Sequence, residues 1–201
     1  MAVPTTSVRG HTTGIPGLLW FDVSLVADDR GFFQEKYHRE KLVAEGMPTD
    51  FHVVQNSLTF NRRGTTRGFH AEPWEKYVSV MNGEAFTAYL DLREGDSFGT
   101  LETVRLDPEK AVFIPRGVAN AYQSLTEGQY YLYSVNEHWT EDAYRWYTFV
   151  NMADDELAVD WPIPLDEALL SARDRAHPPL RETKPLSPAG PGRDGSATPA
   201  T

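Results

Sequence analysis

The chain of 201 residues contains no cysteine. This absence excludes disulfide bonds, thiolate metal sites, iron–sulfur clusters and a cysteine nucleophile. No apolar run reaches the length of about eighteen residues that a membrane-spanning helix needs, and the first residues lack the apolar segment of a signal peptide. We therefore expect a cytoplasmic protein without a membrane partner.

Positive charge is also scarce. The chain carries 19 Lys and Arg residues against 29 Asp and Glu residues, a formal net charge of -10. This balance opposes non-specific attraction to nucleic acid, so we expect no nucleic-acid partner, although a local basic pocket remains compatible with it. With 40% hydrophobic and 24% charged residues, the chain has the composition of a globular protein, and its length suits one domain.

Helical periodicity is rare, and short β-branched and aromatic runs between turn residues dominate the sequence. The predicted strands are Leu18–Val26, Phe51–Phe60, Tyr77–Met81, Ala85–Leu92, Leu101–Leu106, Ala111–Ile114, Ala121–Leu125 and Tyr130–Val135. This pattern predicts an all-β sandwich, jelly roll or barrel.

Turn signals separate these runs, and Asn82-Gly83 between two apolar segments is typical of a β-hairpin. Short helices are predicted at Arg39–Glu45 and Asp166–Arg173, at the periphery of the sheets. Residues 184–201 are rich in Pro, Gly, Ser, Ala and Thr, which predicts a flexible tail after a domain of residues 1–183.

Several common catalytic signatures are missing. The chain has no Gly-x-Ser-x-Gly elbow, no phosphate-binding Gly-x-x-x-x-Gly-Lys loop and no Gly-x-Gly-x-x-Gly fingerprint. These absences argue against a serine hydrolase of the elbow type, a P-loop enzyme and a Rossmann dehydrogenase.

His70 lies in the segment with the highest density of chemically active residues. The run Arg67-Gly-Phe-His70-Ala-Glu72-Pro-Trp-Glu-Lys76 brings together two cations, an imidazole and a carboxylate, a set that suits an anionic ligand. A hydrogen-bonded structural histidine explains the spacing equally well. In a strand His70 and Glu72 would share a face and could both bind a metal, but the third donor near them, Asn120, is a poor ligand, so no metal is expected.

Two further residues are ambiguous on their own. One of Tyr131 and Tyr133 is expected to face an interior cleft from the last predicted strand, although tyrosine is also common on amphipathic strands. Asp174 follows the second predicted helix, where a surface carboxylate without a catalytic role is equally plausible.

The order of these segments resembles the family of dTDP-4-dehydrorhamnose 3,5-epimerases, from about Gly14 to Leu180. The matching stretches are Asp28–Glu35, Val54–Gln55, Arg67–His70, Leu90–Arg93 with Ser97–Gly99, Phe113–Ala119, Leu132–Tyr133, Val159–Pro162 and Leu170–Asp174. The resemblance implies a cupin-type jelly roll of two antiparallel sheets, acting on nucleotide-linked keto sugars without a cofactor.

The resemblance also implies catalytic roles. His70, oriented by Asp174, would remove a proton from a carbon beside the 4-keto group, a step for which imidazole is a suitable base. Lys76, assisted by Arg67, would stabilise the negative charge that develops on the keto oxygen. Tyr133 would return a proton on the opposite face of the sugar ring.

Other matches imply contacts with substrate and a second subunit. Arg30, Phe33 and Glu35 would reach the substrate across a homodimer interface, whereas Gln55 and Arg173 would contact the nucleotide or its phosphates. Trp139 lies near the family's thymine-stacking aromatic residue. Asn120, in the substrate site, departs from the family, since many members have a second active-site histidine there.

We therefore expect an isomerase that inverts carbons 3 and 5 of dTDP-4-keto-6-deoxy-D-glucose, on the route to dTDP-L-rhamnose or a related deoxysugar. One alternative is an epimerase that inverts only carbon 3 or only carbon 5. Another is a sugar-nucleotide-binding cupin without catalytic activity, which Asn120 would suit. A metal-dependent cupin enzyme is disfavoured because Asn120 replaces a metal-binding histidine.

Overall fold

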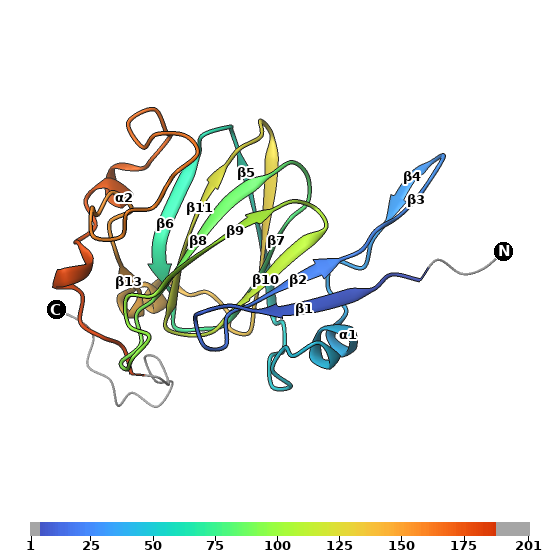
Figure 1. Ribbon diagram of the computed structural model, residues 1–201, viewed down its shortest axis with the longest axis horizontal. Coiled ribbons are helices and arrows are strands. Elements are labelled where there is room, and N and C mark those ends of the chain that lie inside the picture. The colour runs from blue at the N-terminus through green and yellow to red at the C-terminus, as the bar shows by residue number, and fades with distance from the viewer. Residues whose placement is uncertain (1–4, 188–201) are drawn as a thin grey trace.

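The computed structural model describes residues 5–187, and two antiparallel sheets make up its body (Figure 1). One sheet has six strands in the order β1-β2-β10-β7-β12-β5, and the other has five in the order β13-β6-β11-β8-β9. A separate hairpin pairs β3 with β4.

The strands are β1 (Val8–Thr12), β2 (Leu19–Val23), β3 (Val26–Asp28), β4 (Gly31–Phe33), β5 (Gln55–Asn61), β6 (Thr66–Ala71), β7 (Lys76–Val80), β8 (Ala85–Asp91), β9 (Leu101–Leu106), β10 (Lys110–Ile114), β11 (Val118–Ser124), β12 (Gln129–Val135) and β13 (Thr148–Phe149). The helices are α1 (Arg39–Ala44) and α2 (Ala172–Arg175), with 3₁₀ turns η1 (Glu141–Trp146) and η2 (Leu180–Glu182). Each predicted strand overlaps an observed one.

Consecutive strands cross between the two sheets, as from β7 to β8 and from β11 to β12. This crossing of antiparallel strands makes the fold a cupin-like jelly roll, which confirms the expected fold class. The same crossing shows that the hairpin prediction at Asn82-Gly83 is wrong. The turn passes from one sheet to the other and is bonded to the start of β12, where the Tyr130 N–H donates to Asn82 Oδ1 at 2.9 Å.

The buried apolar side chains of the described residues form three clusters. Val78, Val112 and Tyr131 belong to a cluster in which residues from both sheets pack together. Residues of the five-stranded sheet also pack with the C-terminal segment, as Phe69 does with Trp161, and residues of the six-stranded sheet pack with α1. Because both faces of the central strands are covered, β7 and β11 are buried at every position.

The two helix predictions have different outcomes. The prediction at Arg39–Glu45 is confirmed by α1. The prediction at Asp166–Arg173 is wrong over most of its length, because the backbone of Leu169 forms a parallel bridge with Thr65. That pairing requires extended backbone, so the helix forms only after Ser171, which caps it.

Strand β6 is not among the predicted strands, and its sequence contains a glycine. Gly68 has a φ of +124°, and a Cβ at this position would lie 2.4 Å from the Cβ of Ala121 on β11. Glycine therefore permits a backbone approach that any other residue would prevent. The register between β6 and β11 shifts at this point, between Asn120 and Tyr122.

The first residues of the predicted tail are docked on the body. Leu186 forms a β-bridge with Arg93, and its N–H donates to the Leu92 carbonyl at 2.7 Å. Its side chain packs against the cluster that contains Phe69 and Trp161. Within the described residues, contacts with the body thus continue to Leu186. The rest of the predicted tail, residues 188–201, lies outside the described residues.

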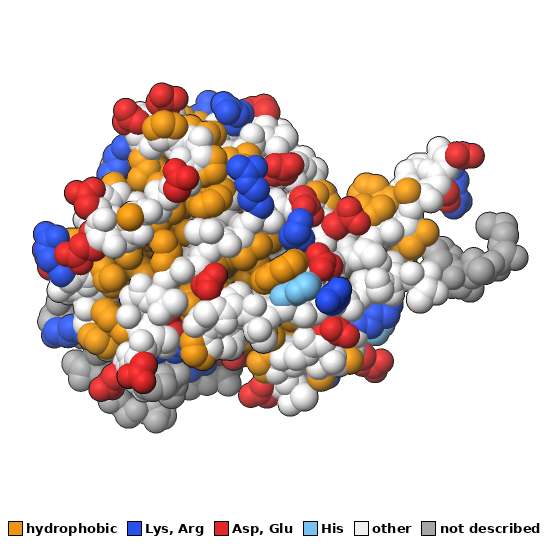
Figure 2. Space-filling model, viewed as in Figure 1, with side chains coloured by type: hydrophobic (Ala, Val, Ile, Leu, Met, Phe, Trp, Pro, Cys, Tyr) orange, Lys and Arg blue, Asp and Glu red, His pale blue; other side chains and the backbone are white. Residues whose placement is uncertain are grey.

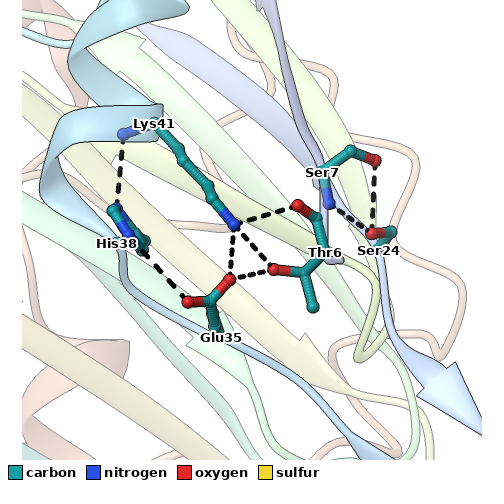
Figure 3. A network of polar contacts seen from close by, with 6 residues as sticks. All are labelled: Thr6, Ser7, Ser24, Glu35, His38 and Lys41. Atoms are coloured by element: carbon teal, nitrogen blue, oxygen red, sulfur yellow. Dashed lines mark hydrogen bonds and ion pairs between the residues drawn. The ribbon is translucent and has the colours of Figure 1, made fainter. Parts of the chain in front are cut away.

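The β3–β4 hairpin projects from the body, and Figures 1 and 2 show it clear of both sheets with hydrophobic side chains along it. Next to it, Lys41 Nζ donates to Glu35 Oε2 at 2.6 Å and to the Thr6 carbonyl at 2.9 Å, while Thr6 Oγ1 also donates to Glu35 (Figure 3). These bonds tie the N-terminal segment, the segment after β4 and α1 together. Among residues 5–187, no helix is long and apolar enough to cross a membrane.

The close approach at Gly68 yields a stability prediction. Gly68→Ala should lower the free energy of unfolding by about 1–3 kcal/mol or more, because the added methyl group overlaps Ala121. Gly95→Ala is a matched control, since Gly95 has a φ of +133° and would bring its Cβ near no atom within 4 Å. Urea unfolding of the two variants separates the overlap from the backbone strain, and equal losses would contradict this interpretation.

Candidate active site

A cavity of about 260 Å³ opens between the two sheets. Its lining residues are Gln55, Ser57, Thr59, Arg67, His70, Glu72, Trp74, Asn120, Tyr122, Tyr133, Val135, Trp139 and Tyr147. Most of them come from β5 and β12 in one sheet and from β6 and β11 in the other. The cavity therefore has two facing walls, each supplied by a different sheet.

His70 occupies a central place on the wall formed by the five-stranded sheet. Strand β6 lies between β11 and β13, so His70 is paired with Asn120 on one side and with Phe149 on the other. The Phe149 ring meets the imidazole edge to face at 5.3 Å. The imidazole is partly exposed to the cavity, and its Nε2 lies 3.0 Å from Oδ1 of Asp174.

Asp174 is buried behind His70, at the start of α2. Ser171, the N-cap of this helix, donates its hydroxyl to Asp174 Oδ2 at 2.9 Å and accepts the Asp174 N–H at 3.0 Å. Burial raises the pKa of Asp174, but the hydrogen bonds from His70 and Ser171 outweigh burial and hold this pKa below its ordinary value. The ionised carboxylate places the ring proton of His70 on Nε2 and leaves Nδ1 as the basic nitrogen.

Lys76 is buried next to the cavity, behind the lining residues Glu72 and Asn120, and its side chain is 1% exposed. Its Nζ donates to Asn120 Oδ1 and lies 3.3 Å from Glu72 Oε1. Burial lowers the pKa of Lys76 below its ordinary value, and the Glu72 carboxylate offsets only part of this effect. A cation is thus held next to the cavity by one carboxylate and one amide, both of which line it.

Strand β12 contributes Tyr133 to the facing wall of the cavity. We expected one of Tyr131 and Tyr133 to face inward, but both do, because residues two apart in a strand share a face. Tyr133 reaches the cavity, and its hydroxyl donates to the Tyr122 hydroxyl at 3.3 Å. Burial, followed by the neighbouring Tyr122, raises the pKa of Tyr133 well above its ordinary value, so the phenol keeps its proton.

Three further residues named from the sequence also line the cavity: Gln55, Arg67 and Trp139. The backbone N–H of Trp139 donates to Gln55 Oε1 at 2.9 Å, and the Trp139 side chain is about half exposed. An aromatic ring and a side-chain amide therefore stand together at this part of the cavity.

Besides Asp174 and Lys76, four residues named from the sequence do not line the cavity of the described chain. Arg30 and Phe33 lie on the projecting hairpin and are exposed, and Arg30 is paired with Asp28. Glu35 is held by Lys41 and Thr6, as described above. Arg173 stacks its guanidinium over the Tyr144 ring at 5.0 Å and donates to the Tyr144 hydroxyl at 2.8 Å.

Other residues of the site were not identified from the sequence. Ser57 and Thr59 line the cavity beside Gln55, and the period of two along a strand could have found them. Tyr147 follows a 3₁₀ turn, and no local pattern marks it. His177 is buried next to Asp174 and stacks on Phe149 at 4.7 Å, but it carried no sequence motif.

The arrangement suits proton transfer. A histidine backed by a buried carboxylate stands on one wall, and a protonated tyrosine stands on the other. Lys76 comes from β7 in the sheet opposite His70, and its Nζ reaches Asn120 on the His70 side, where it can stabilise developing negative charge. Such a cavity can remove a proton from one face of a bound molecule and supply a proton to the other.

Comparisons with known proteins agree with this geometry. Residues 12–182 match the family model of dTDP-4-dehydrorhamnose 3,5-epimerase. The chain belongs to the dTDP-4-dehydrorhamnose 3,5-epimerase family. It is 44% identical over 178 residues to a protein of Streptococcus pyogenes serotype M6 named as an RmlC homolog, covering 87% of this chain and 90% of that protein.

Two more members of the epimerase family extend the comparison. The dTDP-4-dehydrorhamnose 3,5-epimerase of Pseudomonas aeruginosa is 34% identical over 175 residues, covering 84% of this chain and 93% of that enzyme. The structure of RmlC from Streptococcus suis in complex with dTDP-D-xylose superposes with a TM-score of 0.85 at 40% identity, covering 92% of this chain and 96% of that one.

The contact between Ser171 and Asp174 yields a prediction about pH. Ser171→Ala should raise the pKa of Asp174, because one of the bonds that stabilise the carboxylate is lost, and should cost about 0.5–2 kcal/mol as a lost helix cap. Since the folded-state pKa lies below the ordinary value, Asp174 stabilises the fold at higher pH and loses this contribution as pH falls through the folded-state value.

In the Ser171→Ala variant this loss should therefore be complete at a higher pH, and the contribution that is lost should be smaller. Carboxyl ¹³C shifts of Asp174, together with urea unfolding at several pH values, measure both effects. Ser171→Thr, which keeps the hydroxyl, is the matched control. An Asp174 that titrates at the same pH in the Ala variant and the unmodified protein would rule out the proposed stabilisation.

Proposed function

We propose that this protein is a cytoplasmic isomerase that inverts carbons 3 and 5 of dTDP-4-keto-6-deoxy-D-glucose. Its product would serve the synthesis of dTDP-L-rhamnose or a related deoxysugar. The observation that carries the proposal is the His70–Asp174 pair, which faces a protonated Tyr133 across one cavity. Membership of the epimerase family supports the substrate class.

The first step of each inversion is proton removal. His70 Nδ1 takes the proton from the carbon next to the keto group, and the electron pair of that C–H bond moves toward the carbonyl oxygen, giving an enolate. Asp174 stabilises the imidazolium that forms. Lys76 stabilises the enolate oxygen, and Asn120, which accepts a hydrogen bond from Lys76, positions the ammonium group.

The second step returns a proton to the opposite face of the same carbon. Tyr133 donates its phenolic proton from the facing wall, which inverts the centre as the carbonyl re-forms. The hydrogen-bonded chain from Tyr133 to Tyr122 on the opposite sheet and on to Asn61 gives the phenol polar partners between the two sheets. Neither step requires a cofactor, because the keto group of the substrate accepts the electron pair.

The nucleotide part of the substrate would lie at the outer part of the cavity. Trp139 offers an exposed aromatic face for thymine, and Gln55 beside it offers an amide for polar contacts. Arg67 lines the cavity and supplies positive charge for the diphosphate, in a chain whose overall charge is negative. Arg173 is engaged with Tyr144 and would need to turn toward a phosphate to contact it.

We propose that the active unit is a homodimer. Phe32 and Phe33 on the projecting hairpin are 60% and 56% exposed, and Leu58 and Phe60 on the edge strand β5 are 54% and 58% exposed. Exposed apolar groups of this size are typical of surfaces that bind a partner. In the dimer Arg30 and Phe33 of one copy would reach the cavity of the other, while Glu35 would hold the hairpin in place.

The catalytic step has a direct test. In D₂O the protein should introduce deuterium at carbons 3 and 5 of dTDP-4-keto-6-deoxyglucose, as followed by NMR. His70→Ala should slow this exchange by about a hundredfold or more while dTDP still binds, because the base is lost and the nucleotide contacts remain. His11→Ala, which removes a surface histidine paired with Asp22, is the control.

The outcome also separates the alternative functions. Exchange at one carbon only would identify a monoepimerase. No exchange with retained dTDP binding would favour a binding protein or another keto sugar, and loss of binding along with exchange in His70→Ala would indicate a structural role for His70.

Tyr133 should act after His70. Tyr133→Phe should lower the yield of inverted product more than it lowers the rate of deuterium uptake, since proton removal does not need the phenol. Tyr130→Phe, on the outer face of the same strand, provides the control. Equal losses of uptake and inversion would contradict the assigned role.

The dimer can be tested by mixing variants. Arg30→Ala and His70→Ala should each be nearly inactive, but an equal mixture that exchanges subunits should recover about a quarter of full activity. Half of the dimers would then be mixed, and each of these would contain one complete site. Sedimentation velocity checks the association state, and a monomer, or a mixture that recovers nothing, would refute the exchange of hairpin residues.

A further inference from the structure

Three metal-ligating side chains meet behind the cavity. The Nε2 atoms of His70 and His177 lie 3.0 Å and 3.9 Å from the same oxygen, Oδ1 of Asp174. One ligand atom from each of the three residues fits within a span of 4.8 Å. The sequence did not predict this cluster, because Asn120 was the third donor considered for His70, whereas the observed donors Asp174 and His177 lie in the C-terminal segment.

His177 makes the cluster more than a catalytic pair. Its side chain is 6% exposed, and among the described residues neither ring nitrogen makes a hydrogen bond of normal geometry. Within residues 5–187 its one polar backbone neighbour is Gly68, and a buried imidazole without a well-formed hydrogen bond is costly, so an ion that accepts one of its lone pairs would reduce that cost. This unpartnered side chain lies beside the carboxylate that already holds His70.

The three donors are held in place by their surroundings. Phe149 stacks on His177 with an interplanar angle of 27° and meets His70 edge to face. Ser171 binds Asp174 Oδ2 and leaves Oδ1 directed at the two imidazoles. Metal sites commonly use such supporting contacts to orient their ligands.

The donor set matches one class of metal. Two imidazole nitrogens and one carboxylate oxygen, with a fourth position open, are the ligands of many open zinc sites, whereas calcium and magnesium prefer oxygen ligands. With zinc–ligand bonds of about 2.0–2.2 Å, the donors of a tetrahedral site lie about 3.3–3.5 Å apart. The separations of 3.0 Å and 3.9 Å lie on either side of this value.

We propose that His70, Asp174 and His177 form an inhibitory site for Zn²⁺ or a similar divalent transition metal. Binding would use the Nε2 lone pair of His70, which requires the ring proton to move from Nε2 to Nδ1, so that Nδ1 can no longer act as the base of the catalytic step. The bound ion would also separate His70 from the Asp174 carboxylate. The inhibitory effect rests on the proposed epimerase function, whereas the binding itself does not.

Calorimetric titration of the metal-free protein with zinc chloride tests the site. One Zn²⁺ should bind per chain, and His177→Gln should weaken binding by more than about tenfold, because one of three ligands is lost. His11→Gln is the matched control. His11 is also paired with a carboxylate, that of Asp22, but it does not belong to the metal-ligating cluster. His70→Gln, altered at a partly exposed position, gives a second variant should the buried substitution impair folding.

Activity provides an independent readout. Zinc should suppress deuterium exchange in the unmodified protein, EDTA should restore it, and His177→Gln should need at least tenfold more zinc for the same suppression. Failure of the unmodified protein to bind zinc, or equal affinity in the variants, would overturn the site. Binding without suppression would overturn the inhibition. Absence of exchange before zinc is added would instead refute the proposed function, and the titration would still decide the metal site.

Discussion

The approach of β6 to β11 at Gly68 determines the geometry of the active site. Because no side chain separates the two strands at this point, the backbone of β6 lies against Ala121, and the pairing shifts by a bulge near Asn120. His70 then emerges on the inner face, opposite Asn120 and above Asp174. A conformational property of one glycine thus places the base relative to its carboxylate and to the amide that binds Lys76.

The charges of the site are compensated in pairs. Asp174 is ionised behind His70 because Ser171 and the imidazole bind both of its oxygens, and Lys76 is buried because Glu72 and Asn120 bind its ammonium group. Each charge is therefore held in a fixed position before any substrate arrives. Fixed charges of this kind stabilise a developing enolate without the reorganisation that water would require.

The sequence predicted the class of fold well because strand signals are local. Runs such as Leu101–Leu106 carry their apolar pattern and turn residues with them, and the observed strand β9 has the same bounds. Features set by contacts distant in the chain were missed or wrong. Leu169 pairs with Thr65 and forms no helix, and the Asn82-Gly83 turn joins two sheets.

The same division applies to the site. Asp174 contacts His70 although the two residues are 104 positions apart in the chain, and no sequence spacing predicts such a contact. Its catalytic role was assigned only through resemblance to a family, as were the roles of Tyr133 and Lys76. His177 had no counterpart in that reasoning, so its position beside Asp174 emerged only from the folded chain.

The contacts among Thr6, Glu35 and Lys41 have a consequence for how two copies of the protein would communicate. They lie near the surface and fix the direction in which the hairpin leaves the body. In the proposed dimer, that direction decides how Arg30 meets the neighbouring substrate. High ionic strength weakens partly exposed ion pairs of this kind. Salt would then weaken the contact between the hairpin of one subunit and the substrate bound to the other. Catalysis in each copy would therefore depend on the Glu35–Lys41 ion pair of the other copy.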